Sequence, residues 1–114
     1  VWMVEKIPFG DFAKLDMRVG EIKKVEDHPN ADKLLVLTVD LGEGDERTIV
    51  AGLKGFYSAE DLVGKKTIFV ANLEPVSLRG VESNGMILAG VSEDKSVVKI
   101  LEIDNSMEVG TRIS

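Results

Sequence analysis

His28 is the first side chain to test for catalysis, because it is the single histidine of a 114-residue chain that has no cysteine. It stands directly before Pro29, and Asn30 and Asp32 follow; these residue types are typical of a tight turn. A lone histidine without thiolates cannot build a usual zinc site. The sequence also lacks a Gly-x-Ser-x-Gly nucleophile elbow and a phosphate-binding glycine loop. We therefore interpret His28 as a turn residue and expect no catalysis, metal or other cofactor.

The polar segment from Asn72 to Met86 is the second candidate for chemistry. Asn72 offers amide donors and acceptors, Arg79 a planar fork that suits phosphate or guanine, and Ser83 a hydroxyl. Met86 adds a flexible apolar surface on which a base could rest. Together these side chains could bind a single-stranded nucleic acid. From chemistry alone, an ordinary long loop explains them equally well, with Arg79 paired with Glu82 and Met86 in the core.

The charge of the chain restricts any nucleic-acid site to a local patch. The net charge is −6, whereas phosphate affinity comes from clustered lysine and arginine. Lys33 follows the first turn and is the best single candidate for an RNA contact. Further lysines could rim the same face of the molecule, namely Lys23, Lys24, Lys54, Lys65 and Lys66.

Aromatic residues are too few for extensive base stacking. They make up 5% of the chain, and we expect Phe12, Phe56 and Phe69 in the core. Recognition of RNA shape and phosphate positions therefore fits better than sequence reading.

Short strands must position these residues. Alternating apolar residues and β-branched types predict strands over residues 17–25, 34–41, 48–51, 67–73, 86–91 and 97–103. The pattern from Ser58 to Asp61 predicts a capping box and a short helix ending before Gly64, and residues 11–15 suit one helical turn. A helix between the third and fourth strands is typical of the five-stranded OB-fold barrel. We therefore predict an all-β chain built on this barrel.

The first strand contains a glycine that suits such a coiled barrel. Met17 and Val19 share one side, and the apolar set then continues in a shifted phase with Ile22 and Val25. We interpret Gly20 as a β-bulge that produces this shift.

Size and composition indicate a single domain over residues 1–114. We expect residues 1–15 to form a strand or helical extension and residues 92–114 to add C-terminal strands. No apolar run approaches the roughly 20 residues of a membrane span, and no signal-peptide pattern is present, so we expect a cytoplasmic protein without a membrane partner. A charged fraction of 30% and the absence of cysteine and glutamine favour a thermophilic source.

Several blocks of the sequence resemble one known family. They are Phe12 with Leu15–Gly20, His28–Leu34, Gly52–Val63, Asn72-Leu73, Arg79–Met86 and Val109–Thr111, within a similarity that covers nearly the whole chain. The chain resembles the tRNA-binding domain shared by the C-termini of methionyl-tRNA synthetases, free-standing structure-specific tRNA-binding proteins and a monocyte-activating cytokine. The block from Arg79 to Met86 is the most specific. The histidine–proline block also resembles a turn in phenylalanyl-tRNA synthetase and in a bacterial secretion chaperone.

The resemblance implies a non-catalytic OB-fold module that captures L-shaped tRNA, largely without sequence specificity, for a methionyl-tRNA synthetase. Its implied partners are tRNA, the catalytic region of the synthetase and a second copy of the chain, paired through the C-terminal strands. The family positions associated with tRNA binding correspond to Lys33, Asn72, Arg79, Ser83 and Met86.

This chain departs from the family pattern between the asparagine and the arginine. Many members are basic there, whereas Glu74, Val76 and Ser77 occupy these positions here. The departure predicts a lower affinity or a shifted contact surface.

Several alternatives stay open at this stage. The apolar N-terminus from Val1 to Val4 suggests a surface that a symmetric partner could bury, but Trp2 could instead fold back on its own core. A chaperone-like dimer that binds peptide segments, and a purely structural oligomerisation domain, are the competing functions. The chain could be a separate subunit or the C-terminal domain of a synthetase.

Overall fold

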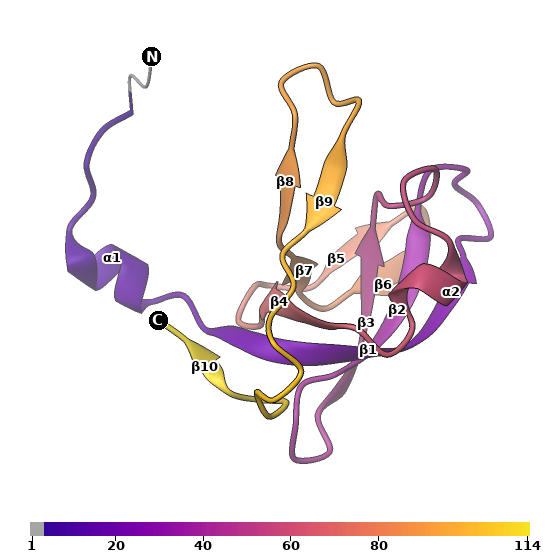
Figure 1. Cartoon of the computed structure of the whole chain (residues 1–114). Helices are drawn as coiled ribbons and strands as arrows, with labels where there is room; N and C mark the ends of the chain where they lie inside the picture. The colour runs from indigo at the N-terminus through magenta and orange to yellow at the C-terminus, as the bar shows by residue number, and fades with distance from the viewer. Residues whose placement is uncertain (1–3) are drawn as a thin grey trace.

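Strand β1 organises the fold because it pairs with three other strands, β2, β4 and β10, all of them antiparallel to it (Figure 1). The computed structural model describes residues 4–114. The main sheet has the order β3-β2-β1-β4-β7, and β10 pairs with β1 beside it. Its strands are β1 (Met17–Asp27), β2 (Leu35–Asp40), β3 (Glu46–Ala51), β4 (Lys66–Val70), β7 (Met86–Ile87) and β10 (Arg112–Ile113).

The sheet curls until β3 meets the segment that precedes β7. The backbone amide of Asn84 donates a hydrogen bond to the carbonyl oxygen of Thr48 (2.8 Å). The Ser83 hydroxyl accepts a hydrogen bond from the Val50 amide (2.9 Å). The five-stranded sheet is thereby nearly closed, which confirms the prediction of an all-β OB-fold barrel.

Helix α2 (Ala59–Leu62) lies between β3 and β4, as predicted. Its N-terminus is fixed by a capping box in which Ser58 Oγ accepts a hydrogen bond from the Asp61 amide (3.2 Å). The Asp61 carboxylate in turn accepts one from the Ser58 amide (3.3 Å). Leu62 is fully buried, so this single turn of helix contributes a side chain to the core.

The predicted bulge at Gly20 is wrong. Gly20 pairs in register with Thr67 of β4, and the register of β1 against β2 shifts instead between Ile22 and Lys24. A Cβ at Gly20 would lie 2.6 Å from the nearest ring carbon of Phe69. Gly20 is therefore required because the buried Phe69 ring packs directly against the backbone of β1.

Three additions extend the barrel: α1 (Phe9–Ala13), the hairpin of β8 (Ala89–Val91) and β9 (Val98–Ile100), and β10. In Figure 1 the N-terminal segment with α1 stands apart from the barrel, and the β8–β9 hairpin projects from it. Trp2, which could have folded back on the core, lies outside the described residues. Over residues 4–114, no helix has the length and apolar character needed to cross a membrane.

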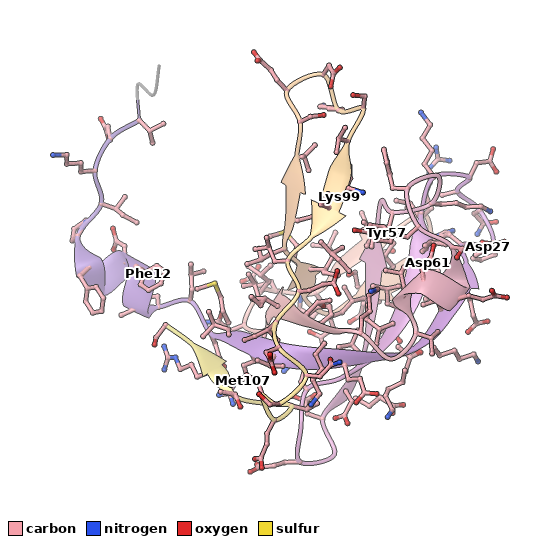
Figure 2. The ribbon with its side chains drawn as sticks, in the orientation of Figure 1. Phe12, Asp27, Tyr57, Asp61, Lys99 and Met107 are labelled. Atoms are coloured by element: carbon pink, nitrogen blue, oxygen red, sulfur yellow. The ribbon has the colours of Figure 1, made fainter. Side chains whose placement is uncertain are left out.

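Only one of the three phenylalanines expected in the core is buried there. Phe69 is fully buried, whereas Phe12 and Phe56 are 37% and 42% exposed. Phe12 lies on α1, outside the barrel (Figure 2), and its ring contacts that of Phe9 at a centroid distance of 6.0 Å. The expectation for Phe12 and Phe56 is wrong because Phe12 lies on the added helix α1 and Phe56 lies in the turn between β3 and α2, where an apolar residue type does not by itself indicate burial.

Candidate nucleic-acid interface

His28 joins the turn that follows β1 to the hairpin formed by β5 (Val76–Leu78) and β6 (Val81–Ser83). The imidazole is buried, and its Nδ1 accepts a hydrogen bond from the Asn30 amide (2.9 Å). The proton therefore sits on Nε2, which donates to the carbonyl oxygen of Leu78 (2.8 Å). The interpretation of His28 as a turn residue is confirmed, because both ring nitrogens are used to hold two loops together.

Arg79 occupies the tip of the β5–β6 hairpin. Leu78 pairs with Val81, which leaves Arg79 and Gly80 as a two-residue turn with φ values of 53° and 90°. These values are those of a type I′ turn, in which glycine is favoured at the second position. The side-chain amide of Asn30 donates to the Arg79 carbonyl oxygen (3.3 Å), so the turn after β1 also holds this tip in place.

The sequence predicts strands over residues 67–73 and 86–91 but none between them, so the β5–β6 hairpin is not among its predictions. Its strands have three residues each and mixed polarity, so alternation gives almost no signal. The dipeptide Arg79-Gly80 between two short β-prone runs was the available sign of a tight hairpin.

Lys33 and Arg79 are exposed cations whose side chains make no ion pair or hydrogen bond within residues 4–114. In particular, the alternative pairing of Arg79 with Glu82 does not form among these contacts. The five lysines expected to rim the face instead form ion pairs or hydrogen bonds within the protein. The pairs are Lys23–Glu21, Lys24–Glu26, Lys54–Asp27 and Lys65–Glu102, and Lys66 donates to the carbonyl oxygens of Asn105 and Met107.

Ser83 is buried within the same hairpin that carries the exposed Arg79 at its tip. Its hydroxyl is buried, accepts from the Val50 amide (2.9 Å) and donates to the Gly85 carbonyl oxygen (3.2 Å). The bond with Val50 fastens β6 to β3, and the bond to Gly85 fixes the turn before β7, so the side chain supports the surface from within.

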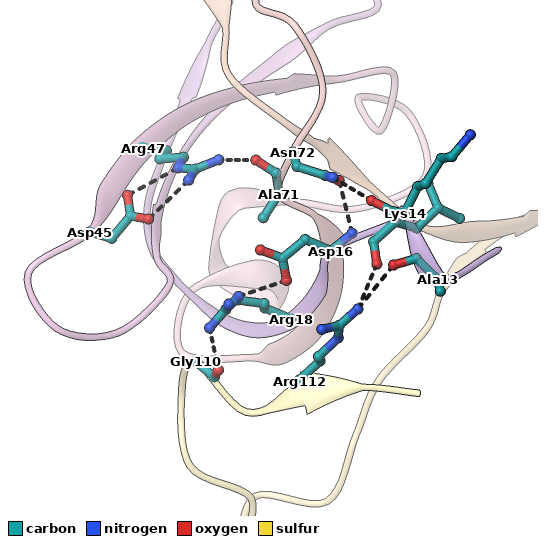
Figure 3. A network of polar contacts seen from close by, with 11 residues as sticks. Ala13, Lys14, Asp16, Arg18, Asp45, Arg47, Ala71, Asn72, Gly110 and Arg112 are labelled. Atoms are coloured by element: carbon teal, nitrogen blue, oxygen red, sulfur yellow. Dashed lines mark hydrogen bonds and ion pairs between the residues drawn. The ribbon is translucent and has the colours of Figure 1, made fainter. Parts of the chain in front are cut away.

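Asn72 holds the N-terminal segment. Its side-chain oxygen accepts from the Asp16 amide (2.8 Å), and its nitrogen donates to the Lys14 carbonyl oxygen (2.6 Å; Figure 3). Asp16 precedes the start of β1, whereas Lys33 follows the end of that strand. The structure therefore brings the loops of Lys33 and Arg79 together but gives Asn72 a separate structural task.

A polar hollow of about 500 Å³ lies below this junction. Arg18 donates to Asp16 (2.8 Å), and Arg47 makes a two-pronged contact with Asp45 (3.0 Å for each nitrogen) and a hydrogen bond to the Ala71 carbonyl oxygen. Asp16 raises the pKa of Arg18, first through the hydrogen bond and then through its charge. With four carboxylates against two guanidinium groups in its lining, this hollow does not suit a polyanion.

Met86 borders a second, apolar hollow of about 410 Å³. Met86 and Phe56 on its walls are 47% and 42% exposed. Its other lining residues are Val50, Ala51, Gly52, Leu53, Ile87, Ala89, Val91, Lys95 and Val98. Because the Val50 amide donates to Ser83, this hollow lies beside the hairpin that carries Arg79 at its tip, and the exposed Met86 is available for contact.

Comparison with known sequences identifies the family. The family model described as "Putative tRNA binding domain" matches residues 17–112. A methionine–tRNA ligase from Pyrococcus horikoshii is 53% identical over 110 residues, which are 96% of this chain and 15% of that enzyme. The corresponding enzyme from Methanocaldococcus jannaschii is 46% identical over 96% of this chain and 17% of its own length. The chain thus spans a small part of these relatives.

Solved structures agree with this assignment. The MetRS-related protein from Pyrococcus horikoshii superposes with a TM-score of 0.91 and 40% identity, over 97% of this chain and 100% of that one. The chaperone CsaA from Bacillus anthracis has a TM-score of 0.86 and 31% identity, over 96% of this chain and 100% of that one. With the match over residues 17–112 and the barrel described above, the chain belongs to the tRNA-binding domain family.

Proposed function

We propose that the chain is a non-catalytic module that captures tRNA for a methionyl-tRNA synthetase, in cis or in trans. The observation that carries this proposal is the joining of two loops, each with an uncommitted cation, through His28 and Asn30. Lys33 and Arg79 lie on these loops, and phosphate oxygens are the ligands that such cations prefer. The methionine–tRNA ligases with similar segments support the choice of RNA partner.

The proposed RNA contact consists of Lys33, Arg79 and Met86 at the surface, with Ser83 as a support for it. Asn72 acts indirectly, by holding residues 14–16 in place. Two cations and one apolar side chain carry little base-specific information, so we propose recognition of the folded shape of tRNA.

We further propose that the module works as a homodimer. Val4, Ile7 and Phe9 of the N-terminal segment are exposed. Their apolar surface stands outside the barrel, where a second copy could cover it. Two weak RNA contacts on one rigid dimer would gain affinity through effective concentration.

A titration of intact tRNA and of a tRNA minihelix, repeated at increasing salt, tests the function. Binding through phosphates predicts an affinity that falls with salt, with a log-log slope of about −0.7 to −0.9 per contact. Tighter binding of intact tRNA than of the minihelix would support recognition of the whole L shape. Native mass spectrometry of the same complex gives the number of protein chains, and a complex with one chain would contradict the dimer.

A chaperone-like peptide-binding module is the second candidate, favoured by the apolar hollow and by the similarity to CsaA. Apolar peptide binding predicts little loss of affinity with rising salt. An absence of tRNA binding in dilute buffer, with salt-resistant binding of an apolar peptide, would replace the first proposal by this one.

A further inference from the structure

We propose that the apolar hollow beside Met86 is a subsite for one unpaired nucleobase of the bound RNA, and that Lys95 on its rim contacts an adjoining phosphate. The inference rests on the proposed RNA-binding function and adds to it a defined ligand group and two residues, Phe56 and Lys95. Neither residue is among the five positions that the family resemblance associates with tRNA binding.

The walls of the hollow suit the face of a base. Phe56 and Met86 are large, half-exposed and supported by buried neighbours, among them Leu53 and Ala51. An aromatic ring and a polarisable thioether are the side chains on which bases of any type can rest. The hollow is open to solvent, and its volume of about 410 Å³ is large enough for one base.

Lys95 supplies a positive charge that can bind the phosphate of a nucleotide, a group that an apolar peptide lacks. It is the charged member of the described lining, and its ammonium makes no ion pair in residues 4–114. The neighbouring Asp94 carboxylate makes no ion pair with Lys95 and is held within the turn, because its Oδ1 accepts from the hydroxyls of Ser92 (2.8 Å) and Ser96 (2.7 Å) and from the Ser96 amide (3.1 Å). A base always arrives with a phosphate, so an apolar hollow with a free cation matches a nucleotide better than an uncharged peptide.

The hollow lies near the two loops proposed to contact RNA. Ser83 bonds to Val50 of the lining, and Gly52 of the lining lies against Leu34, next to Lys33; a Cβ on Gly52 would lie 4.0 Å from the Leu34 side chain. A strand of RNA held by Lys33 and Arg79 therefore has the hollow at its side.

Methyl NMR of the four methionines tests the subsite directly. The protein is titrated with a short single-stranded RNA, with the same backbone lacking bases, and with an apolar peptide. We expect the base-containing RNA to shift the Met86 methyl through ring currents and to leave Met17 and Met107 in place. Binding of both RNAs with no shift at Met86 would overturn the subsite while leaving RNA binding intact. A shift of Met86 with the peptide alone would assign the hollow to peptide instead.

A matched pair of charge variants completes the test. Lys95→Gln keeps a side chain at a position with φ of 63°, so the turn is preserved while the charge is lost. Lys99→Gln removes the same charge on the same hairpin. Lys99 neighbours Val98 of the lining, and because side chains alternate along a strand it faces away from the hollow.

We expect Lys95→Gln to weaken RNA binding about 3- to 10-fold and to lower the salt slope by roughly one contact, with Lys99→Gln unchanged. Equal affinities for the two variants and the native chain would overturn the role of Lys95. Failure of the native chain to bind any RNA would instead overturn the function itself.

Discussion

The Nε2–H of His28 donates to the carbonyl oxygen of Leu78 (2.8 Å), so the turn after β1 and the β5–β6 hairpin form one unit. The ring spans the two loops that carry Lys33 and Arg79, although it contacts neither side chain. Positioning of the proposed RNA contact thus depends on a residue that is buried and polar.

His28→Ala should lower both stability and RNA affinity. The Asn30 amide and the Leu78 carbonyl oxygen would lose their partners, at a cost of about 1–3 kcal/mol in the free energy of unfolding. Chemical denaturation measures this loss, and tRNA titration well below the melting temperature measures the second effect. If the variant is less stable but binds tRNA with the native affinity, the two loops keep their arrangement without the ring.

Arg79→Asn should separate the function of the turn tip from its structure. Asparagine tolerates the φ of 53° at this position and is favoured in type I′ turns, so we expect an unchanged or slightly raised melting temperature. The charge is lost, so tRNA affinity should fall and the salt slope should decrease by about one contact. Undiminished tRNA binding would remove Arg79 from the interface.

Ser83→Ala should act mainly on stability. The variant leaves the Val50 amide without its acceptor in a buried place, which predicts a loss of about 1–3 kcal/mol in the free energy of unfolding. Ser77→Ala, on the exposed strand β5 of the same hairpin, is the matched control and should be nearly neutral. If Ser83→Ala unfolds like the native chain but binds tRNA poorly, the hydroxyl contacts RNA directly.

The capping-box contacts of Asp61 predict that part of the free energy of unfolding is lost in acid. Its hydrogen bonds with Ser58 lower the pKa of the Asp61 carboxyl below the ordinary value of 3.8. A carboxyl with a lowered pKa in the folded state stabilises it at pH values above the unfolded pKa, and this contribution is lost as the pH falls through the folded pKa. Melting temperatures of Asp61→Asn should therefore decline less steeply than those of the native chain between roughly pH 5 and pH 2.

Glu60→Gln removes the same charge one residue away, outside the capping box, and serves as the control. Parallel acid profiles for Asp61→Asn and the native chain would contradict the role of the capping box in acid sensitivity.

The barrel could be predicted because its signals are local. Alternation marks β1 to β4, and the Ser58–Asp61 pattern marks the helix between β3 and β4. The bulge could not be located from the sequence, because a phase shift in β1 shows that a residue is inserted but not where. The requirement for Gly20 comes from Phe69 on a distant strand, and such a contact leaves no local trace.

The candidate site was predictable as a set of residues but not as a set of roles. Lys33, Arg79 and Met86 are exposed, in keeping with contact residues, whereas Asn72 and Ser83 form hydrogen bonds within the fold. An amide and a hydroxyl look alike in a sequence whether they face a ligand or a backbone group. Which lysines are free also depends on neighbours that are distant in the sequence, as the pairing of Lys65 with Glu102 shows.

Five of the ten lysines pair with nearby acids, and this pairing has a kinetic consequence for the proposed partner. With a net charge of −6, the molecule repels a polyanion over much of its surface, and attraction is expected where unpaired cations such as Lys33, Arg79 and Lys95 lie. Productive encounters with tRNA would be favoured there over the rest of the surface. Added salt would then weaken the repulsion during approach as well as the attraction in the complex, so association should slow less than dissociation accelerates.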